Sequence, residues 1–179
     1  MFPKVIPWVK ECHNKQYIFK EIKRLNTYEQ KVKNFLDQKT IAIAGVSRNP
    51  KMEVGNVIYK KFRSAGYTVF PINPSAELIE GDKCYPNLKS VPGKIDAVFI
   101  ATNPNASVKV VKQCVELGIK KIWFHRSFGN GSFSEEAAKL GEDNGLSVIK
   151  SGCPMMYIKK IDFFHRITKF FMRLTGKLA

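Results

Sequence analysis

The chain has 179 residues, of which 44% are hydrophobic, and this is enough for one domain with a hydrophobic core plus short extensions. Its 30 Lys and Arg against 15 Asp and Glu give a formal net charge of +15, which favours anionic partners such as a phosphorylated cofactor, nucleic acid or an acidic membrane. The four cysteines form no zinc or disulfide pattern, and no apolar run reaches the roughly 18 residues of a membrane-spanning helix. We therefore expect a cytoplasmic protein with reduced thiols.

The predicted elements begin with a basic extension over residues 1–38, in which the stretch NTYEQKVKNFLDQK indicates a helix with one apolar side. From Lys39 onward, short apolar strands alternate with amphipathic helices. Five strands are predicted, at Thr40–Gly45, Tyr67–Ile72, Asp96–Thr102, Lys120–Phe124 and Leu146–Lys150. They are rich in β-branched residues and almost continuously apolar, which is typical of parallel strands buried on both faces.

Three helices are predicted between these strands, at Val54–Ala65, Asn105–Leu117 and Ser134–Asn144. A glycine follows each of them directly before the next strand, and glycine readily adopts the left-handed conformation that ends a helix. The segment 73–94 is too interrupted by prolines and glycines to form a long helix. The alternation of strands and helices indicates an α/β fold with a doubly wound, parallel five-stranded sheet and right-handed crossovers.

The last segment, residues 158–179, predicts a basic amphipathic helix. Its apolar residues recur at helical spacing and are Ile158, Ile161, Phe164, Ile167, Phe171, Leu174 and Leu178. Such a helix can lie on an anionic membrane, bind a partner, or pack its apolar stripe on the core or on a second subunit in a homodimer. We expect packing, with membrane or nucleic-acid binding through the basic termini as the alternatives.

The loop after the first predicted strand has the character of an anion site. It follows Gly45, and its polar and cationic residues are Ser47, Arg48, Asn49 and Lys51. At the carboxyl edge of a parallel sheet, free N–H groups and the positive end of the next helix favour a phosphate. The loop is not a P-loop, because Pro50 stands where the second glycine is required, and it keeps only the first glycine of the dinucleotide fingerprint.

The end of the second predicted strand narrows the choice of nucleotide. Dinucleotide-binding proteins usually place an acidic residue there to bind the ribose hydroxyls, whereas this chain has Asn73 in YTVFPINP. A carboxylate would repel a phosphorylated ribose, and an amide with nearby cations would accept one. The sequence therefore disfavours NAD and leaves NADP and coenzyme A (CoA).

Four spaced motifs, IAIAGVSRNP, GYTVFPINP, AVFIATNP and VIKSGCPMMY, resemble those of the small stand-alone CoA-binding proteins, which are related to the N-terminal domain of the succinyl-CoA synthetase α subunit. The resemblance implies a Rossmann-like domain, here residues 39–157, with CoA lying across the strand ends. By position, Gly45, Val46, Ser47 and Arg48 match the phosphate loop of the family. Residues matching the loops near the adenosine are Asn73, Pro74, Thr102, Asn103 and Pro104. The chain departs from the family at Gly152, where many members have arginine.

Two residues could carry chemistry. His125 follows the fourth predicted strand and Cys153 the fifth, although each has an ordinary structural interpretation as a hydrogen-bonded or buried side chain. The sequence shows no nucleophile–base arrangement, paired carboxylates or metal-ligand set. We therefore predict no catalytic residue and a module that binds CoA or an acyl-CoA to sense or carry it. A small acyl-CoA- or NADP-dependent enzyme using His125 or Cys153 is the alternative, and so is a basic membrane- or nucleic-acid-interaction protein.

Overall fold

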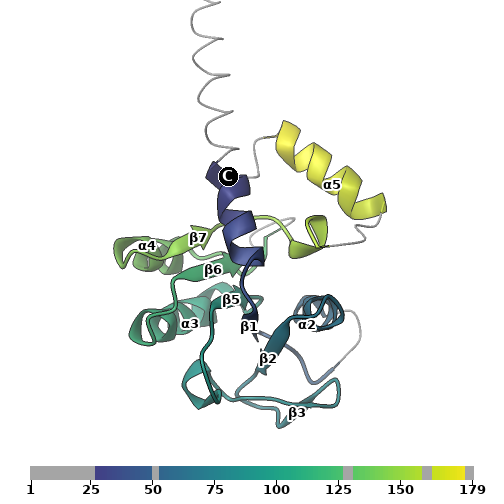
Figure 1. The fold of residues 1–179 in the computed structure, drawn as a ribbon. Helices are drawn as coiled ribbons and strands as arrows, with labels where there is room; N and C mark the ends of the chain where they lie inside the picture. The colour runs from purple at the N-terminus through teal and green to yellow at the C-terminus, as the bar shows by residue number, and fades with distance from the viewer. Residues whose placement is uncertain (1–26, 50–52, 127–130, 159–162, 176–179) are drawn as a thin grey trace, which may run out of the picture.

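The main sheet is parallel and is covered by helices on both faces. A computed structural model describes residues 27–49, 53–126, 131–158 and 163–175 of the chain (Figure 1). The strands of the sheet are β1 (Thr40–Ala44), β2 (Thr68–Ile72), β5 (Ala97–Ile100), β6 (Lys121–Phe124) and β7 (Ser147–Ile149), in the spatial order β2-β1-β5-β6-β7. All five predicted strands are confirmed, and so is the α/β, Rossmann-like fold class.

The helices between the strands also agree with the prediction. They are α2 (Val54–Ser64), α3 (Pro104–Glu116) and α4 (Glu135–Asp143). The glycines that follow them have positive φ angles, as a left-handed helix end requires, and are Gly66, Gly118 and Gly145.

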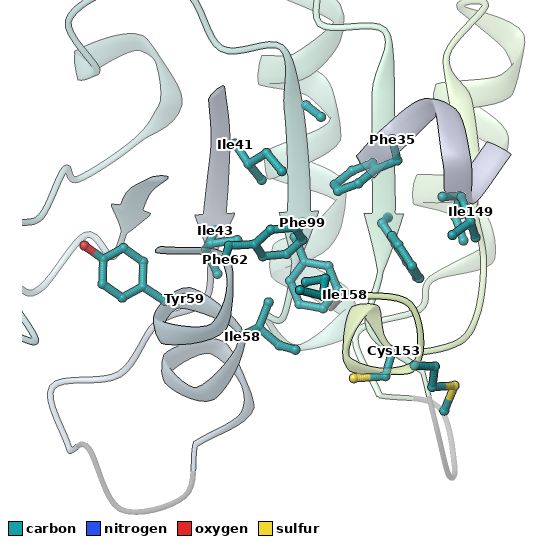
Figure 2. Close-up of a cluster of buried hydrophobic side chains, with 14 of the residues drawn as sticks. Phe35, Ile41, Ile43, Ile58, Tyr59, Phe62, Phe99, Ile149, Cys153 and Ile158 are labelled. Carbon is teal, nitrogen blue, oxygen red and sulfur yellow. The ribbon is translucent and has the colours of Figure 1, made fainter. Parts of the chain in front are cut away.

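The two faces of the sheet bury different kinds of side chain. In β1, Ile41 and Ile43 point toward α2 and the helix of residues 27–36, whereas the small Ala42 and Ala44 belong to the cluster under α3 and α4. The helix of residues 27–36 contributes Phe35, whose ring meets that of Trp123 edge-on with the centroids 5.3 Å apart. Figure 2 shows Phe35 beside these sheet residues, so part of the basic extension is an integral piece of the core.

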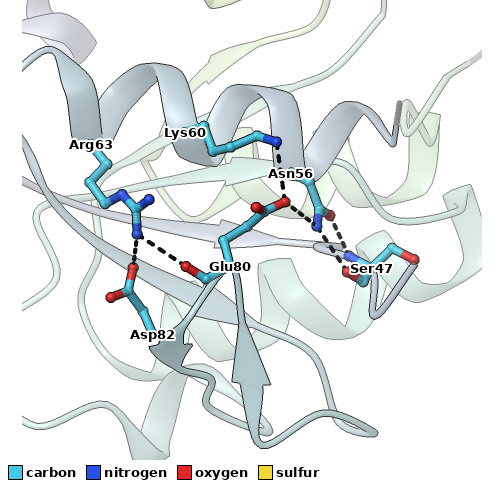
Figure 3. Close-up of polar contacts among 6 residues, drawn as sticks. All are labelled: Ser47, Asn56, Lys60, Arg63, Glu80 and Asp82. Atoms are coloured by element: carbon cyan, nitrogen blue, oxygen red, sulfur yellow. Dashed lines mark hydrogen bonds and ion pairs between the residues drawn. The ribbon is translucent and has the colours of Figure 1, made fainter. Parts of the chain in front are cut away.

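The proline- and glycine-rich segment between β2 and β5 contains only short elements, as predicted. A two-stranded antiparallel hairpin is formed by β3 (Leu78–Ile79) and β4 (Asp82–Lys83), and a 3-10 turn, η1, follows at Leu88–Ser90. The turn of the hairpin contains Glu80 with a φ of +50° and Gly81 with a φ of +85°. This hairpin lies beside α2, and Glu80 in its turn contacts Asn56 of that helix (Figure 3).

The C-terminal helix differs from the prediction. After a 3-10 turn, η2 (Pro154–Met156), Ile158 is buried in the core, and the helix α5 begins only at Phe163 and runs to Leu174. Those members of the predicted stripe that lie on the described helix, Ile167, Phe171 and Leu174, are exposed and do not pack on the core of this chain. The other form of the expectation, packing on a second subunit, stays a prediction. Ile161, Leu178 and the side chain of Phe164 lie outside the described part of the chain.

Candidate functional site

The candidate site lies where the strand order of the sheet reverses. β1 pairs with β2 on one side and with β5 on the other, so the loops that leave the carboxyl ends of β1 and β5 diverge from adjacent strands. Ligands of open α/β sheets bind at this reversal. The structure therefore brings together the turn that begins at Gly45 and the loop at residues 101–104, as the sequence predicted.

Two glycines allow β1, β5 and α2 to approach one another at this point. Gly45 has a φ of +98°, and a Cβ there would lie 2.5 Å from the carbonyl carbon of Ala101 at the end of β5. Gly55 lies in the first turn of α2, where a Cβ would lie 2.3 Å from the carbonyl oxygen of Gly45. The start of α2 therefore packs directly against the backbone of the turn. The sequence analysis did not predict this role of Gly55.

Asn56 holds the turn through a pair of hydrogen bonds to one residue. The backbone N–H of Ser47 donates to Asn56 Oδ1 at 2.7 Å, and Asn56 Nδ2 donates to the carbonyl oxygen of Ser47 at 2.9 Å (Figure 3). Asn56 is only 1% exposed. The sequence analysis missed it, although a polar residue three positions before Tyr59 on the buried side of an amphipathic helix was a usable signal.

Hydrogen bonds and ion pairs tie the hairpin β3–β4 to the same helix. Asn56 Nδ2 also donates to Glu80 Oε1 at 3.2 Å, and Lys60 Nζ lies 3.3 Å from that oxygen. The hydrogen bond from Asn56, assisted by Lys60, lowers the pKa of Glu80 below its usual range. Asp82 bonds to Tyr59 and Arg63 of α2, and the Tyr59 bond, with the help of Arg63, lowers its pKa as well.

A hydrogen bond from Asn73 to Val46 holds the other side of the turn. Asn73 Nδ2 donates to the carbonyl oxygen of Val46 at 2.6 Å, while Asn73 Oδ1 accepts a hydrogen bond from the N–H of Ser75 at 2.8 Å. The side chain of Val46 is buried, so this residue faces the site with its backbone. Both polar atoms of the Asn73 side chain thus bind protein backbone, and Pro74 beside it is exposed.

The loop after β5 forms the start of α3. Asn103 is the N-cap, and its Oδ1 accepts a hydrogen bond from the N–H of Ala106 at 2.9 Å, with Pro104 in the first turn. The hydroxyl of Thr102 lies 2.9 Å from that of Ser107, which is itself buried. These polar contacts hold the predicted adenosine loop next to Gly45.

The helices at this edge differ in whether a side chain of the N-cap residue accepts a hydrogen bond from the first turn. α3 is capped by Asn103 and α4 by Ser134, whose Oγ accepts from the N–H of Ala137. Glu53, the N-cap of α2, makes no side-chain cap hydrogen bond. The first N–H groups of α2 therefore point their partial positive charge toward the turn without a side-chain acceptor from the cap residue.

The tip of the turn is polar and accessible. The side chains of Arg48 and Asn49 are exposed, and the N–H of Asn49 donates to the Ser47 hydroxyl oxygen at 3.1 Å. Lys51 was predicted to bind phosphate and lies outside the described residues. Arrangements of this kind, with backbone N–H groups, a hydroxyl and a guanidinium at a helix start, suit a phosphate.

The two candidate chemical residues lie at the carboxyl ends of β6 and β7. His125 is half-buried, with its ring 6.2 Å from that of Phe99, and burial lowers its pKa, so the neutral imidazole is favoured. Cys153 is buried, as expected for a structural cysteine. Nearby, the Arg126 guanidinium lies over the ring of Phe133, 4.7 Å from the centroid.

The described residues lack two features that would point to a metal site or to a membrane span. They contain no cluster of three or more His, Cys, Asp or Glu that could hold a metal ion, and none of their helices is long and apolar enough to cross a membrane. A small cavity of about 160 Å³ lies at the opposite, amino-terminal edge of the sheet, where Lys94, Ile95 and Ile119 are among its lining residues. It is separate from the turn after β1.

Comparisons with known proteins agree on one family. A sequence model of the CoA binding domain matches residues 39–159. The chain is 27% identical over 145 residues to the uncharacterized protein YneT of Bacillus subtilis, covering 80% of this chain and 98% of that protein. It is also 26% identical over 126 residues to the alpha subunit of acetate–CoA ligase (ADP-forming) II of Pyrococcus furiosus, covering 66% of this chain and 27% of that subunit.

Solved structures agree with these matches. A hypothetical protein from Pyrococcus horikoshii OT3 superimposes with a TM-score of 0.64 at 30% identity, covering 70% of this chain and 85% of that one. The chain thus spans most of the small relatives but only about a quarter of the ligase subunit. The resemblance carried by the four sequence motifs is confirmed, and the chain belongs to the CoA binding domain family.

Proposed function

We propose that this protein binds CoA or an acyl-CoA across the carboxyl edge of its sheet and acts as a non-catalytic sensing or carrier module. The observation that carries the proposal is the turn after β1. It lies at the strand-order reversal, its tip is accessible, and the helix it leads into lacks a side-chain cap. Membership of the CoA binding domain family supports the choice of ligand.

In this proposal the diphosphate of CoA meets the turn between Gly45 and Lys51. The N–H groups of the first turn of α2, the hydroxyl of Ser47 and the guanidinium of Arg48 supply hydrogen bonds and positive charge. Charge-assisted bonds of this kind contribute about 1.5–3 kcal/mol each. Asn56 acts as a positioning residue. It is buried and holds the Ser47 backbone in place, and it is not itself proposed to contact CoA.

The adenosine end is proposed to lie over the exposed Pro74 and the loop of Thr102, Asn103 and Pro104. Asn73 serves this site by holding the Val46 carbonyl, since its side chain is already bonded to backbone on both sides. The residues proposed to contact CoA are therefore those of the turn after β1, Pro74 and the loop of residues 102–104, with Asn73 acting through the turn. Cations near the turn would accept the additional phosphate on the CoA ribose.

The experiment that tests this function is a calorimetric ranking of CoA, dephospho-CoA, NADP and NAD. We expect CoA to bind most tightly and dephospho-CoA to bind at least about tenfold less tightly, because one charge-assisted bond is worth about that much. The variant Arg48→Gln should lose about tenfold or more in CoA affinity, whereas Lys94→Gln, at an exposed position on the opposite edge of the sheet, should match the unaltered protein. Tighter binding of NADP than of CoA would overturn the proposal.

A second candidate function is catalytic and is favoured by the likeness to acetate–CoA ligases. In that case the chain would supply the CoA-binding part of a thioester-forming reaction, with His125 or Cys153 as the reactive group. The buried Cys153 thiol is a poor nucleophile in this structure because attack requires an accessible thiolate. A turnover screen of acyl-CoA substrates with His125→Ala and Cys153→Ala variants separates the two functions: activity lost in either variant supports catalysis.

We also propose that this function operates in the cytoplasm. The thiols of Cys84 and Cys114 are both buried and form no disulfide, which fits a reducing compartment.

A further inference from the structure

The outward face of α5 is an exposed apolar stripe. Its residues have exposed fractions between 40% and 78% and are Phe163, Ile167, Phe170, Phe171 and Leu174. Their spacing of three, four and seven positions places them on one side of the helix. In Figure 1, α5 lies at the periphery of the protein.

The opposite face of α5 is the one that packs on the domain. Thr168 and Met172 are buried there, and Lys169 Nζ lies 3.6 Å from the centroid of the Tyr157 ring. Lys169 and Arg173 also lie 3.9 Å and 3.8 Å from Glu29 Oε1. These contacts fix the rotation of the helix about its axis, so the apolar side faces solvent, the reverse of an ordinary surface helix.

Cations border the apolar stripe. Arg166 is exposed and stands three positions after Phe163 and four before Phe170, and the half-exposed Arg173 stands three positions after Phe170. Across residues 158–179 the sequence contains six Lys and Arg and a single Asp. An apolar stripe edged by cations is the pattern of a helix that lies in the interface of a membrane.

We propose that α5 docks this protein on an anionic phospholipid bilayer, with the apolar stripe at the headgroup–acyl boundary and Arg166 against lipid phosphates. At about 1.5 Å per residue the 12-residue helix is about 18 Å long, which suits surface binding rather than crossing a core of about 30 Å. Each cation near such a surface adds to the attraction, and the attraction weakens as salt rises.

Charge favours this occupant over two alternatives. A second copy of the chain on the same face would bring two bodies of formal charge +15 together at their most basic segment. Residues 1–26 of the same chain carry six Lys and Arg against two Glu, so they also share its sign. An anionic lipid surface is opposite in charge to all of these segments.

The test is co-sedimentation of the full chain with vesicles of phosphatidylcholine alone and with added phosphatidylglycerol, over a series of salt concentrations. We expect binding only to the anionic vesicles and a decrease with salt. The triple variant Phe163→Gln, Phe170→Gln, Leu174→Gln should lose at least about tenfold in affinity because it removes the apolar contact. Its matched control is Leu78→Gln with Leu117→Gln, two exposed leucines on other elements, which should change affinity less than about twofold.

A charge pair completes the test. Arg166→Glu should weaken vesicle binding by at least about fivefold, while Lys109→Glu, with the same change in net charge on exposed α3, should have a much smaller effect. Circular dichroism of every variant checks that the fold is intact. CoA titration checks that the proposed CoA site is intact. Equal binding to neutral vesicles, absence of vesicle binding, or a dimer that the triple variant dissociates would each overturn the proposal.

Discussion

Replacing Asn56 is the sharpest test of how the turn after β1 is held. Asn56→Ala removes the hydrogen bonds to the N–H and the carbonyl of Ser47 and the bond to Glu80. At about 1 kcal/mol for each bond, and with water able to reach the half-buried Ser47, we expect the free energy of unfolding to fall by about 2–3 kcal/mol. CoA affinity should fall as well, because the turn must then be ordered when the ligand binds.

The variant Asn56→Asp separates hydrogen bonding from packing. Its Oδ1 still accepts from the Ser47 N–H, but the other oxygen replaces a donor and faces the Ser47 carbonyl and Glu80. This repulsion raises the pKa of the new carboxyl in the folded state above its unfolded value of about 3.9. The variant should therefore be less stable than Asn56→Ala at pH 7, and its deficit should shrink as the pH falls through the raised pKa and the carboxyl becomes protonated.

Urea unfolding at pH 7 and near pH 4.5, with CoA titration, measures both effects. Asn34→Asp is the control, because it makes the same change of charge at an exposed helical position. Its free energy of unfolding should change by less than about 0.5 kcal/mol. The reasoning is refuted if the alanine and aspartate variants at Asn56 have equal stability at both pH values, or if neither alters the affinity for CoA.

The other predictions concern backbone contact, acid stability and thiol reactivity. Gly55→Ala places a Cβ against the Gly45 carbonyl oxygen and should reduce the urea-derived free energy of unfolding by at least about 2 kcal/mol; an unchanged midpoint would contradict the close approach. Glu80 and Asp82 have lowered pKa values, so their stabilisation is present above about pH 4 and is lost as the pH falls through the folded values. The double variant Glu80→Gln, Asp82→Asn should therefore flatten the acid limb of the stability curve, and an unaltered limb would refute this. Burial raises the pKa of the Cys114 thiol to about 12, so alkylation at pH 8 should be much slower in the folded protein than in urea; equal rates would show an accessible thiol.

The fold was predictable because its signals are local and repeat along the chain. Continuous apolar runs such as Ala97–Ile100 identify buried parallel strands, and the glycines after the helices mark where each ends. Gly45 was identified as the start of the turn for the same reason, since it directly follows a run of this kind.

The parts that were missed depend on contacts between distant residues. Gly55 is needed because its neighbour is the carbonyl of Gly45, and Asn56 because its amide reaches Ser47, and neither partner can be read from the local pattern. The orientation of α5 was wrong for a related reason. Periodicity shows that Ile167 and Leu174 share a side, but contacts such as that of Lys169 with Tyr157 decide which side meets the domain.

The way the turn is anchored has a consequence for how ligand preference can change. Its ends are held by backbone-directed bonds from Asn56 and Asn73 and by the Gly45–Gly55 contact, none of which uses the side chain of Arg48. Residue 48 can consequently be exchanged while the backbone beneath it stays in place. Selectivity among phosphorylated nucleotides is thus open to redesign through a substitution at this one position.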